Sequence, residues 1–251
     1  MDRRTCGPVC PARFVKALPV AAAVCLLFWS LPSPAPGGQS YLSATFNDKT
    51  IDKPIGTGGP ALGEPNWVDE EIEAIVRATP FETPSLEVRN LTSAGNMGFE
   101  LDDAVSEGIV AVIIDLWLYK DNPCTTWLDL YNSGWNLLAK VEFESNNTFS
   151  IHDADGVVVS GAPFAAGRPL PLLMVLDFDA DTYSIWIDAV QQVSERFLNI
   201  TSPNFRRIIF YAGWDCPEGN HFSIDQVRII DHEPRVPVEV PTWGSLRALF
   251  R

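Results

Sequence analysis

The sequence predicts an all-β protein in which two antiparallel sheets pack face to face as a β-sandwich. Apolar and polar residues alternate in many segments, most clearly in DFDADTYSIWID at 177–188 and HFSIDQVRII at 221–230. Turn-forming residues separate these segments at intervals of ~8–12 residues, and no long amphipathic helix is apparent. Many short strands without a convincing long helix are typical of two packed sheets.

The expected strands follow one another along residues 43–232. A breaker-rich stretch, PIGTGGPALGEP at 54–65, interrupts them, and Asp155-Gly156 is a strong hairpin dipeptide. Residues 66–79 have apolar residues at helical spacing as well as alternation, and we favour a strand because the rest of the chain is β-rich. The predicted strands cover residues 43–48, 66–79, 85–90, 98–102, 108–119, 126–131, 135–143, 147–151, 156–160, 169–179, 182–188, 205–213 and 221–231.

Two neighbouring predicted strands have one aliphatic side and one mixed side. The aliphatic sides, which we expect to lie between the sheets, hold Val110, Val112, Ile114, Leu116, Leu118, Leu128 and Leu130. The mixed sides hold Asp115, Trp117, Tyr119, Trp127, Asp129 and Tyr131, with Trp186, Tyr211 and Trp214 as further aromatic candidates. If the two strands adjoin, these rings form a platform for stacking sugar rings, and Asp115 and Asp129 accept hydrogen bonds from sugar hydroxyls. The alternative is that the tryptophans are core residues.

Residues 1–40 have the pattern of a secretory signal followed by a breaker segment. A basic lead precedes an apolar run at 17–31, which is shorter than the ~20 residues of a membrane-spanning helix. We expect cleavage near Ser40 and therefore a secreted or cell-envelope protein with no membrane-spanning segment. The alternative is an uncleaved N-terminal anchor.

The expected mature chain is strongly acidic. Residues 1–40 hold four of the 18 basic and one of the 32 acidic residues, which leaves 14 basic and 31 acidic residues, a net charge of −17. Such a charge repels phosphate backbones, so nucleic acid is excluded as a partner. The chain beyond the signal is expected to divide into a sandwich domain at 41–232 and a proline-spaced segment with a short amphipathic tail at 233–251. The tail either attaches the protein to a surface or folds back on its own domain.

Two cysteines, Cys124 and Cys216, follow residue 40, and in an exported chain we expect them to form one disulfide. The alternative is two buried thiols. Alternating carboxylates near turns are candidate calcium ligands, because Ca²⁺ prefers several oxygen ligands from loops. The candidates are Asp153, Asp155, Asp177, Asp179 and Asp181. The alternative is that these residues only shape their turns.

The segments TYSIWIDAVQQV at 182–193 and HFSIDQVRII at 221–230 resemble the concanavalin A-like lectin/glucanase superfamily, and specifically its LamG-type jelly-roll modules of exported bacterial proteins. The resemblance covers residues 41–232 and implies a strand, a tight turn and a short return strand at 182–193, and calcium at a sheet rim. The chain departs from the family at Asp188-Ala189, where a glycine is usual. Because Ala disfavours positive φ, a type I′ turn is not expected there.

The sequence contains no recognisable catalytic site. The superfamily's glucanases carry a Glu-x-Asp-x-x-Glu run, whereas Glu100-Leu101-Asp102 is followed by valine at position 105. No nucleophile elbow is present, and the three histidines lack the spacing of a zinc site. The favoured function is a non-enzymatic carbohydrate- or surface-binding module assisted by calcium, whose partner is a glycan or cell-surface polymer. The alternatives are a glycan hydrolase or lyase of the same superfamily and a structural envelope protein attached through its tail.

Overall fold

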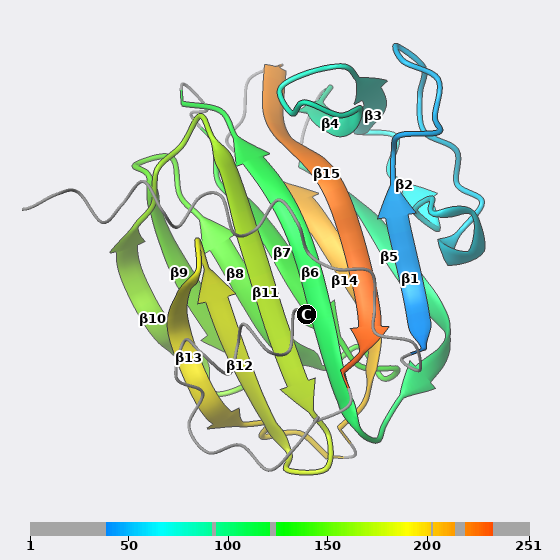
Figure 1. Cartoon of the computed structure of the whole chain (residues 1–251). Coiled ribbons are helices and arrows are strands. Elements are labelled where there is room, and N and C mark those ends of the chain that lie inside the picture. Colours follow the sequence, from blue (N-terminus) through cyan, green and yellow to red (C-terminus); the bar gives the residue numbers. More distant parts are fainter. Residues whose placement is uncertain (1–38, 92–93, 121–123, 202, 214–218, 233–251) are drawn as a thin grey trace, which may run out of the picture.

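The chain forms two antiparallel sheets that pack against each other, as the sequence predicts (Figure 1). The computed structural model describes residues 39–91, 94–120, 124–201, 203–213 and 219–232. Residues 1–38 of the expected signal segment at 1–40, the tail at 233–251, Trp214 and Cys216 lie outside the described residues. Within the described residues, the helical structure consists of one 3₁₀ turn, η3 (Pro60–Leu62), and no helix has the length and apolar character needed to span a bilayer.

One sheet has eight strands and faces the viewer in Figure 1. Its strands in spatial order are β13 (Val190–Phe197), β12 (Thr182–Ile187), β11 (Pro169–Asp177), β6 (Ile109–Leu118), β15 (Gly219–Asp231), β4 (Ser85–Asn90) and β3 (Ile72–Arg77). The eighth strand, β1 (Ser40–Thr45), pairs with the second half of β15, while β4 pairs with the first half. The long β15 therefore pairs with three strands, β6 on one side and β4 and β1 on the other.

The other sheet has seven strands and lies behind the first in Figure 1. Its strands in spatial order are β10 (Gly156–Pro163), β9 (Thr148–Asp153), β8 (Leu137–Phe143), β7 (Thr126–Tyr131), β14 (Phe205–Ala212), β5 (Gly95–Val105) and β2 (Trp67–Val68). β14 lies between β7 and β5, so residues far apart in the sequence share the centre of this sheet.

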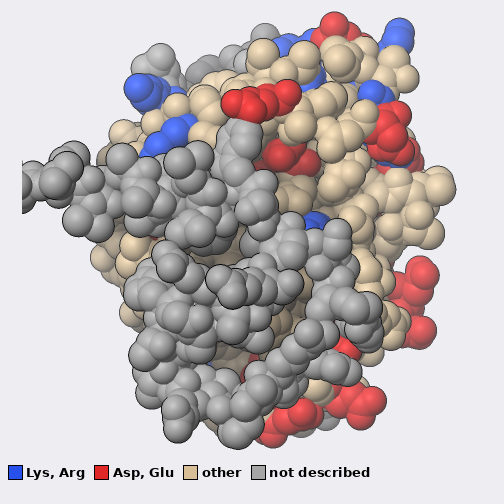
Figure 2. Space-filling model, in the orientation of Figure 1, with Lys and Arg blue, Asp and Glu red and all other residues tan. Residues whose placement is uncertain are grey.

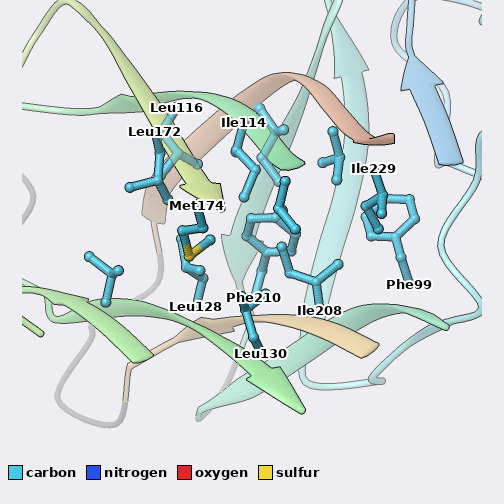
Figure 3. Close-up of a cluster of buried hydrophobic side chains, with 14 of the residues drawn as sticks. Phe99, Ile114, Leu116, Leu128, Leu130, Leu172, Met174, Ile208, Phe210 and Ile229 are labelled. Atoms are coloured by element: carbon cyan, nitrogen blue, oxygen red, sulfur yellow. The ribbon is translucent and has the colours of Figure 1, made fainter. Parts of the chain in front are cut away.

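The core lies between the two sheets and consists of the aliphatic sides predicted from alternation. The five predicted inner residues of β6, from Val110 to Leu118, are at most 3% exposed, and Leu128 and Leu130 of β7 are equally buried. In Figure 3, Leu116 and Met174 of one sheet point toward Leu128 and Phe210 of the other. Period-two alternation thus identified the buried side of these two strands correctly.

Several local expectations differ from the structure. Residues 66–79, expected as one strand, form β2 and β3, which belong to different sheets. The first strand covers 40–45 rather than 43–48, and Asp231 N–H donates to the carbonyl of Gln39 (2.8 Å), which extends the pairing with β15. The return strand β13, implied within 182–193 by the family resemblance, is absent from the strands predicted by alternation because VQQVSERF is mostly polar, and it extends to Phe197 at the sheet edge. The predicted strand at 135–143 begins only at Leu137.

The tight turn between β12 and β13 forms although glycine is missing. Asp188 and Ala189 both have positive φ values, 53° and 62°, so the expectation against a two-residue left-handed turn was wrong. Left-handed backbone costs roughly 1–2 kcal/mol per non-glycine residue. Arg168 forms an ion pair with Asp188, and Asp188 N–H donates to the carbonyl of Pro171 (2.9 Å), so tertiary contacts offset that cost.

Candidate functional site

The predicted aromatic platform does not form, because its two halves lie on opposite surfaces of the sandwich. β6 belongs to the eight-stranded sheet and β7 to the seven-stranded sheet. Leu116 and Leu128 both point into the shared core, so Trp117 and Trp127 point away from each other. The alternation specifies which side of a strand is buried, but it does not specify which sheet the strand joins.

On the eight-stranded sheet, the predicted ligand residues contact neighbours within the same layer. Asp115 accepts a hydrogen bond from Gln226 Nε2 (2.5 Å), and burial raises the pKa of Asp115. Trp117 packs edge-on against Phe81, with ring centroids 5.8 Å apart. The Tyr119 hydroxyl lies near two polar side chains: Glu87 (3.2 Å) and Ser223 (3.0 Å). These contacts give each of the three residues a structural partner within its own layer.

The outer surface of the seven-stranded sheet is richer in aromatic side chains, and we call it the aromatic face. Register places Tyr211 of β14 opposite Trp127 of β7, and the two rings stack with centroids 5.0 Å apart and an interplanar angle of 14°. Trp67 of β2 covers Gly98 of β5, where an added Cβ would meet the indole ring at 2.1 Å. The aromatic face comprises Trp67, Trp127, Tyr131, Trp135 and Tyr211.

Trp135 is the most accessible ring of this group. It is 56% exposed and sits in the turn between β7 and β8 with a φ of 64°. The guanidinium of Arg207 lies 4.2 Å from one side of the ring, and Tyr131 packs beside it at 5.8 Å. Our sequence prediction missed Trp135 by placing it inside a strand; the signal that could have found it is the Asn132-Ser133-Gly134 turn that directly precedes it.

Arg207, which packs on one side of the Trp135 ring, is fixed by its own hydrogen bonds. Its side chain donates to Glu100 Oε1 (2.8 Å) and to the carbonyls of Asn132 (3.1 Å) and Ser133 (3.3 Å). Burial acts to raise the pKa of Glu100, but the two arginines that bind it, Arg207 and Arg206, outweigh burial and lower that pKa. Glu100, considered above for an incomplete glucanase motif, thus anchors the base of the aromatic face.

Asp129 lies beneath the rings at the centre of the aromatic face and is 5% exposed. Its Oδ2 accepts a hydrogen bond from the Tyr131 hydroxyl (2.8 Å), while Oδ1 is buried without a partner. Burial raises the pKa of Asp129 to about 6, although Tyr131 and Lys140 act in the opposite direction. Burial and the adjacent carboxylate also raise the pKa of Tyr131. Asp129 therefore positions Tyr131 rather than facing solvent as the predicted hydroxyl acceptor.

We expect Asp129→Asn to stabilise the protein at pH 7.5 by about 1–3 kcal/mol. The folded-state pKa of Asp129 is raised, so the penalty for its ionisation is complete above about pH 6 and disappears as the pH falls toward the unfolded value of about 4. Asparagine stays neutral and can still accept from Tyr131. Urea unfolding of both proteins at pH 4, 5, 6 and 7.5 measures the difference. A stability difference that does not change with pH would contradict the prediction.

Polar side chains of β8 and β9 border the rings on the other side. Lys140 Nζ lies 4.9 Å from the centre of the Trp127 ring and forms an ion pair with Glu142 (2.7 Å). His152 Nε2 lies 3.7 Å from the same carboxylate. Trp127 is therefore enclosed by Tyr211 and Lys140, which leaves Trp135 as the ring with the most accessible surface.

Asp153, a predicted calcium ligand, joins the two sheets. It is buried at the end of β9 and accepts hydrogen bonds from the Tyr183 hydroxyl (2.9 Å), from Arg196 and from the Asp155 N–H (2.9 Å). Asp155 lies in the hairpin turn and accepts a hydrogen bond from Asn199 Nδ2 (2.5 Å). These two carboxylates therefore have structural partners in the hairpin.

The second predicted calcium set shapes the turn between β11 and β12. Asp177 Oδ1 accepts from the N–H groups of Asp179 (3.1 Å) and Ala180 (2.9 Å). Asp179 Oδ1 accepts from the N–H of Gly108 (2.9 Å), and Asp181 has a φ of 53°. Across the described ranges, no three His, Cys, Asp or Glu side chains come together closely enough to hold a metal ion. Calcium binding stays a prediction.

Cys124 is buried and disulfide-bonded just before β7. Thr126 of β7, two residues after Cys124, pairs with Ala212 at the end of β14. The pairing of Cys124 with Cys216 remains the prediction made from sequence, because Cys216 lies outside the described residues.

No family model matches the chain, and no curated protein matches its sequence significantly. Solved structures share its fold. A protein of unknown function from Shewanella oneidensis MR-1 is 11% identical with a TM-score of 0.54, and the match covers 94% of this chain and 100% of that one. A sialidase is 13% identical with a TM-score of 0.51, covering 67% of this chain and 17% of that one. The Trypanosoma rangeli sialidase in complex with the inhibitor DANA is 12% identical with a TM-score of 0.50, covering 95% and 39%.

These similarities define the class of the protein as an all-β, two-sheet sandwich. The chain spans well under half the length of the two sialidases, so it resembles one part of those larger proteins. At such low identities the likeness shows the fold alone. The narrower LamG-type assignment is not confirmed and stays a prediction.

Proposed function

We propose that this protein is an exported, non-enzymatic carbohydrate-binding module whose glycan lies on the aromatic face. The observation that carries the proposal is Trp135, an exposed indole held in place by Arg207 and bordered by Tyr131. The C–H groups of a sugar ring stack on such surfaces. An exposed aromatic residue with nearby polar groups can therefore contact the apolar side of a sugar while the polar groups bind its hydroxyls. The hydroxyl groups of Tyr131 and Tyr211 and the Lys140–Glu142 pair are polar groups on the same face, along β7 and the strands that flank it, and they are available to hydrogen-bond a glycan that extends from Trp135 toward Trp127.

The position of Trp135 makes the proposal more specific than the sequence prediction. The platform inferred from Trp117 and Trp127 is divided between two surfaces, whereas the rings from Trp67 to Trp135 share one. Rigid support lowers the entropic cost of binding, because the ring does not have to be immobilised by the ligand. Arg207 provides that support through three hydrogen bonds to groups beneath the turn.

Trp135→Ala is expected to weaken glycan binding by about 1–3 kcal/mol, or roughly 5- to 150-fold, while the protein stays folded. The full chain is first screened on a glycan array with calcium and with chelator, and the strongest ligand is then titrated calorimetrically. Phe197→Ala is the matched control, since Phe197 is 60% exposed but lies on β13 at the edge of the other sheet. Equal affinities of the two variants would contradict the proposed site, and absence of binding to any glycan would contradict the proposed function.

A hydrolase is the second candidate function, favoured by one observation. Glycoside hydrolysis needs two carboxyl groups, and Asp129 on β7 lies diagonal to Glu142 on β8, with the pKa of Asp129 raised to about 6. The burial of Asp129 argues against direct contact with a substrate. Release of reducing sugar by the wild type, lost in Asp129→Asn while binding persists, would identify an enzyme instead of a binding module.

The chelator arm also tests the calcium prediction. Binding lost with chelator would direct mutagenesis to Asp153, Asp155 and the 177–181 turn, whereas binding that survives chelator places the whole interaction on the aromatic face. A protein that binds no glycan but is released from the cell when residues 242–251 are deleted would be a structural envelope protein.

A further inference from the structure

Each basic side chain described on the aromatic face is already paired with an acid. Lys140 Nζ lies 2.7 Å from Glu142, and Arg206 and Arg207 lie 2.7 and 2.8 Å from Glu100. Arg207 Nε has no partner, but it is buried against the ring of Trp135 and cannot reach a ligand on the surface. A ligand carboxylate or sulfate would therefore have to displace an internal carboxylate to find a cation.

The remaining charge on the face is negative. Asp129 lies beneath the rings with no cation within ion-pair distance, and it is ionised above about pH 6. If an anionic ligand took Lys140, Glu142 would lose its lysine partner on the strand next to Asp129 and would keep only His152 nearby. The chain as a whole also carries a formal net charge of −14, which slows the approach of an anionic polymer. On the eight-stranded side, Figure 2 shows acidic side chains at the lower right, while acidic and basic side chains are mixed along the upper margin.

We infer that the glycan is uncharged and that sugars bearing carboxylate or sulfate groups are excluded. The inference rests on the proposed function and names the ligand class of the same site. The hydroxyl groups of a neutral sugar can share the Lys140–Glu142 pair without breaking it, since a hydroxyl both donates and accepts. An anion cannot do so, and an unpaired like charge at an interface costs several kcal/mol.

The experiment compares matched neutral and acidic oligosaccharides on the full chain at pH 7.5. Lactose is paired with sialyllactose, and linear galacto-oligosaccharides are paired with oligogalacturonates of equal length. The neutral member of a pair is expected to bind, and its acidic counterpart at least about tenfold more weakly. Equal or tighter binding of the acidic member would overturn the inference and leave the proposed function standing. If neither neutral nor acidic sugars bind, in these pairs or on the array, both the inference and the proposed function are overturned.

A variant that releases Lys140 tests the reason for the exclusion. Glu142→Gln keeps the side-chain shape and leaves Lys140 without its carboxylate, so binding of the acidic member should rise about two- to fivefold at low salt and fall again as salt increases. Glu107→Gln is the control, because it changes the net charge equally at an exposed position in the turn between β5 and β6. An equal gain in both variants would attribute the exclusion to net charge and overturn the role of the Lys140–Glu142 pair.

Discussion

Replacing Phe210 by alanine is expected to lower the free energy of unfolding by about 3–5 kcal/mol. Phe210 is 1% exposed on the inner side of β14, where it contacts Phe99 at right angles and stacks on Phe222, each at a centroid distance of 6.3 Å. Figure 3 shows Phe210 in the centre of the core, between residues of both sheets. Neighbouring side chains that belong to hydrogen-bonded strands cannot collapse into the space left by the ring, so the lost contacts are not replaced.

Urea unfolding monitored by tryptophan fluorescence measures the effect of Phe210→Ala. Phe197→Ala is the control, because a side chain 60% exposed at the edge strand β13 should change stability by no more than about 0.5 kcal/mol. Both variants should be compared under oxidising conditions, which keep the disulfide of Cys124 intact. Similar losses in the two variants would show that the centre of the sandwich is packed more loosely than its structure indicates.

Asp153→Ala is expected to lower the free energy of unfolding by about 2–4 kcal/mol, the second largest effect that we predict. Asp153 extends from the seven-stranded sheet and binds the hydroxyl of Tyr183, which belongs to the other sheet and is 1% exposed. Its removal leaves that hydroxyl without an acceptor and removes the nearer ion partner of Arg196, which then retains only the weaker contact with Asp155 at 3.9 Å. The value is below that of a fully buried pair because 38% of the Arg196 side chain is exposed.

The contribution of Asp153 should also depend on pH. Burial acts to raise its pKa, but hydrogen bonds from Arg196, Tyr183 and the Asp155 N–H outweigh burial, so the folded-state pKa is lowered. A depressed pKa contributes stability that is present above the unfolded value of about 4 and is lost as the pH falls through the folded value. The stability difference between wild type and Asp153→Ala should therefore be largest near neutral pH and shrink below about pH 4.

Asp155→Ala provides the comparison for this residue. Asp155 is in the same hairpin, but its side chain is 45% exposed, and its loss should cost less than about 1 kcal/mol. Thermal unfolding at pH 3, 4, 5 and 7 separates the two carboxylates. If added calcium stabilises the wild type and neither variant, these residues have a metal-binding role as well as a structural one. Equal losses of stability in both variants would contradict the proposed role of Asp153 in linking the two sheets through Tyr183.

The aromatic face shows why part of the candidate site was found from sequence and part was not. Trp127, Tyr131 and Asp129 were identified because their strand has a clear inner side, and the structure places all three on the outer side. Trp135 was missed because its exposure depends on the left-handed turn that precedes β8. Arg207 and Glu100 come from β14 and β5, which are brought beside β7 only by the strand order of the sheet.

The sequence by itself determined the all-β class, the approximate position of most strands and the buried side of β6 and β7. Those properties follow from local alternation and turn residues, which act over a few positions of the chain. The tertiary structure alone decided that β6 and β7 join different sheets, that Asp188-Ala189 forms a left-handed turn beside Arg168, and that Asp153 links Tyr183 to the opposite sheet. These features depend on pairings between residues distant in sequence, and alternation is the same whichever sheet a strand enters.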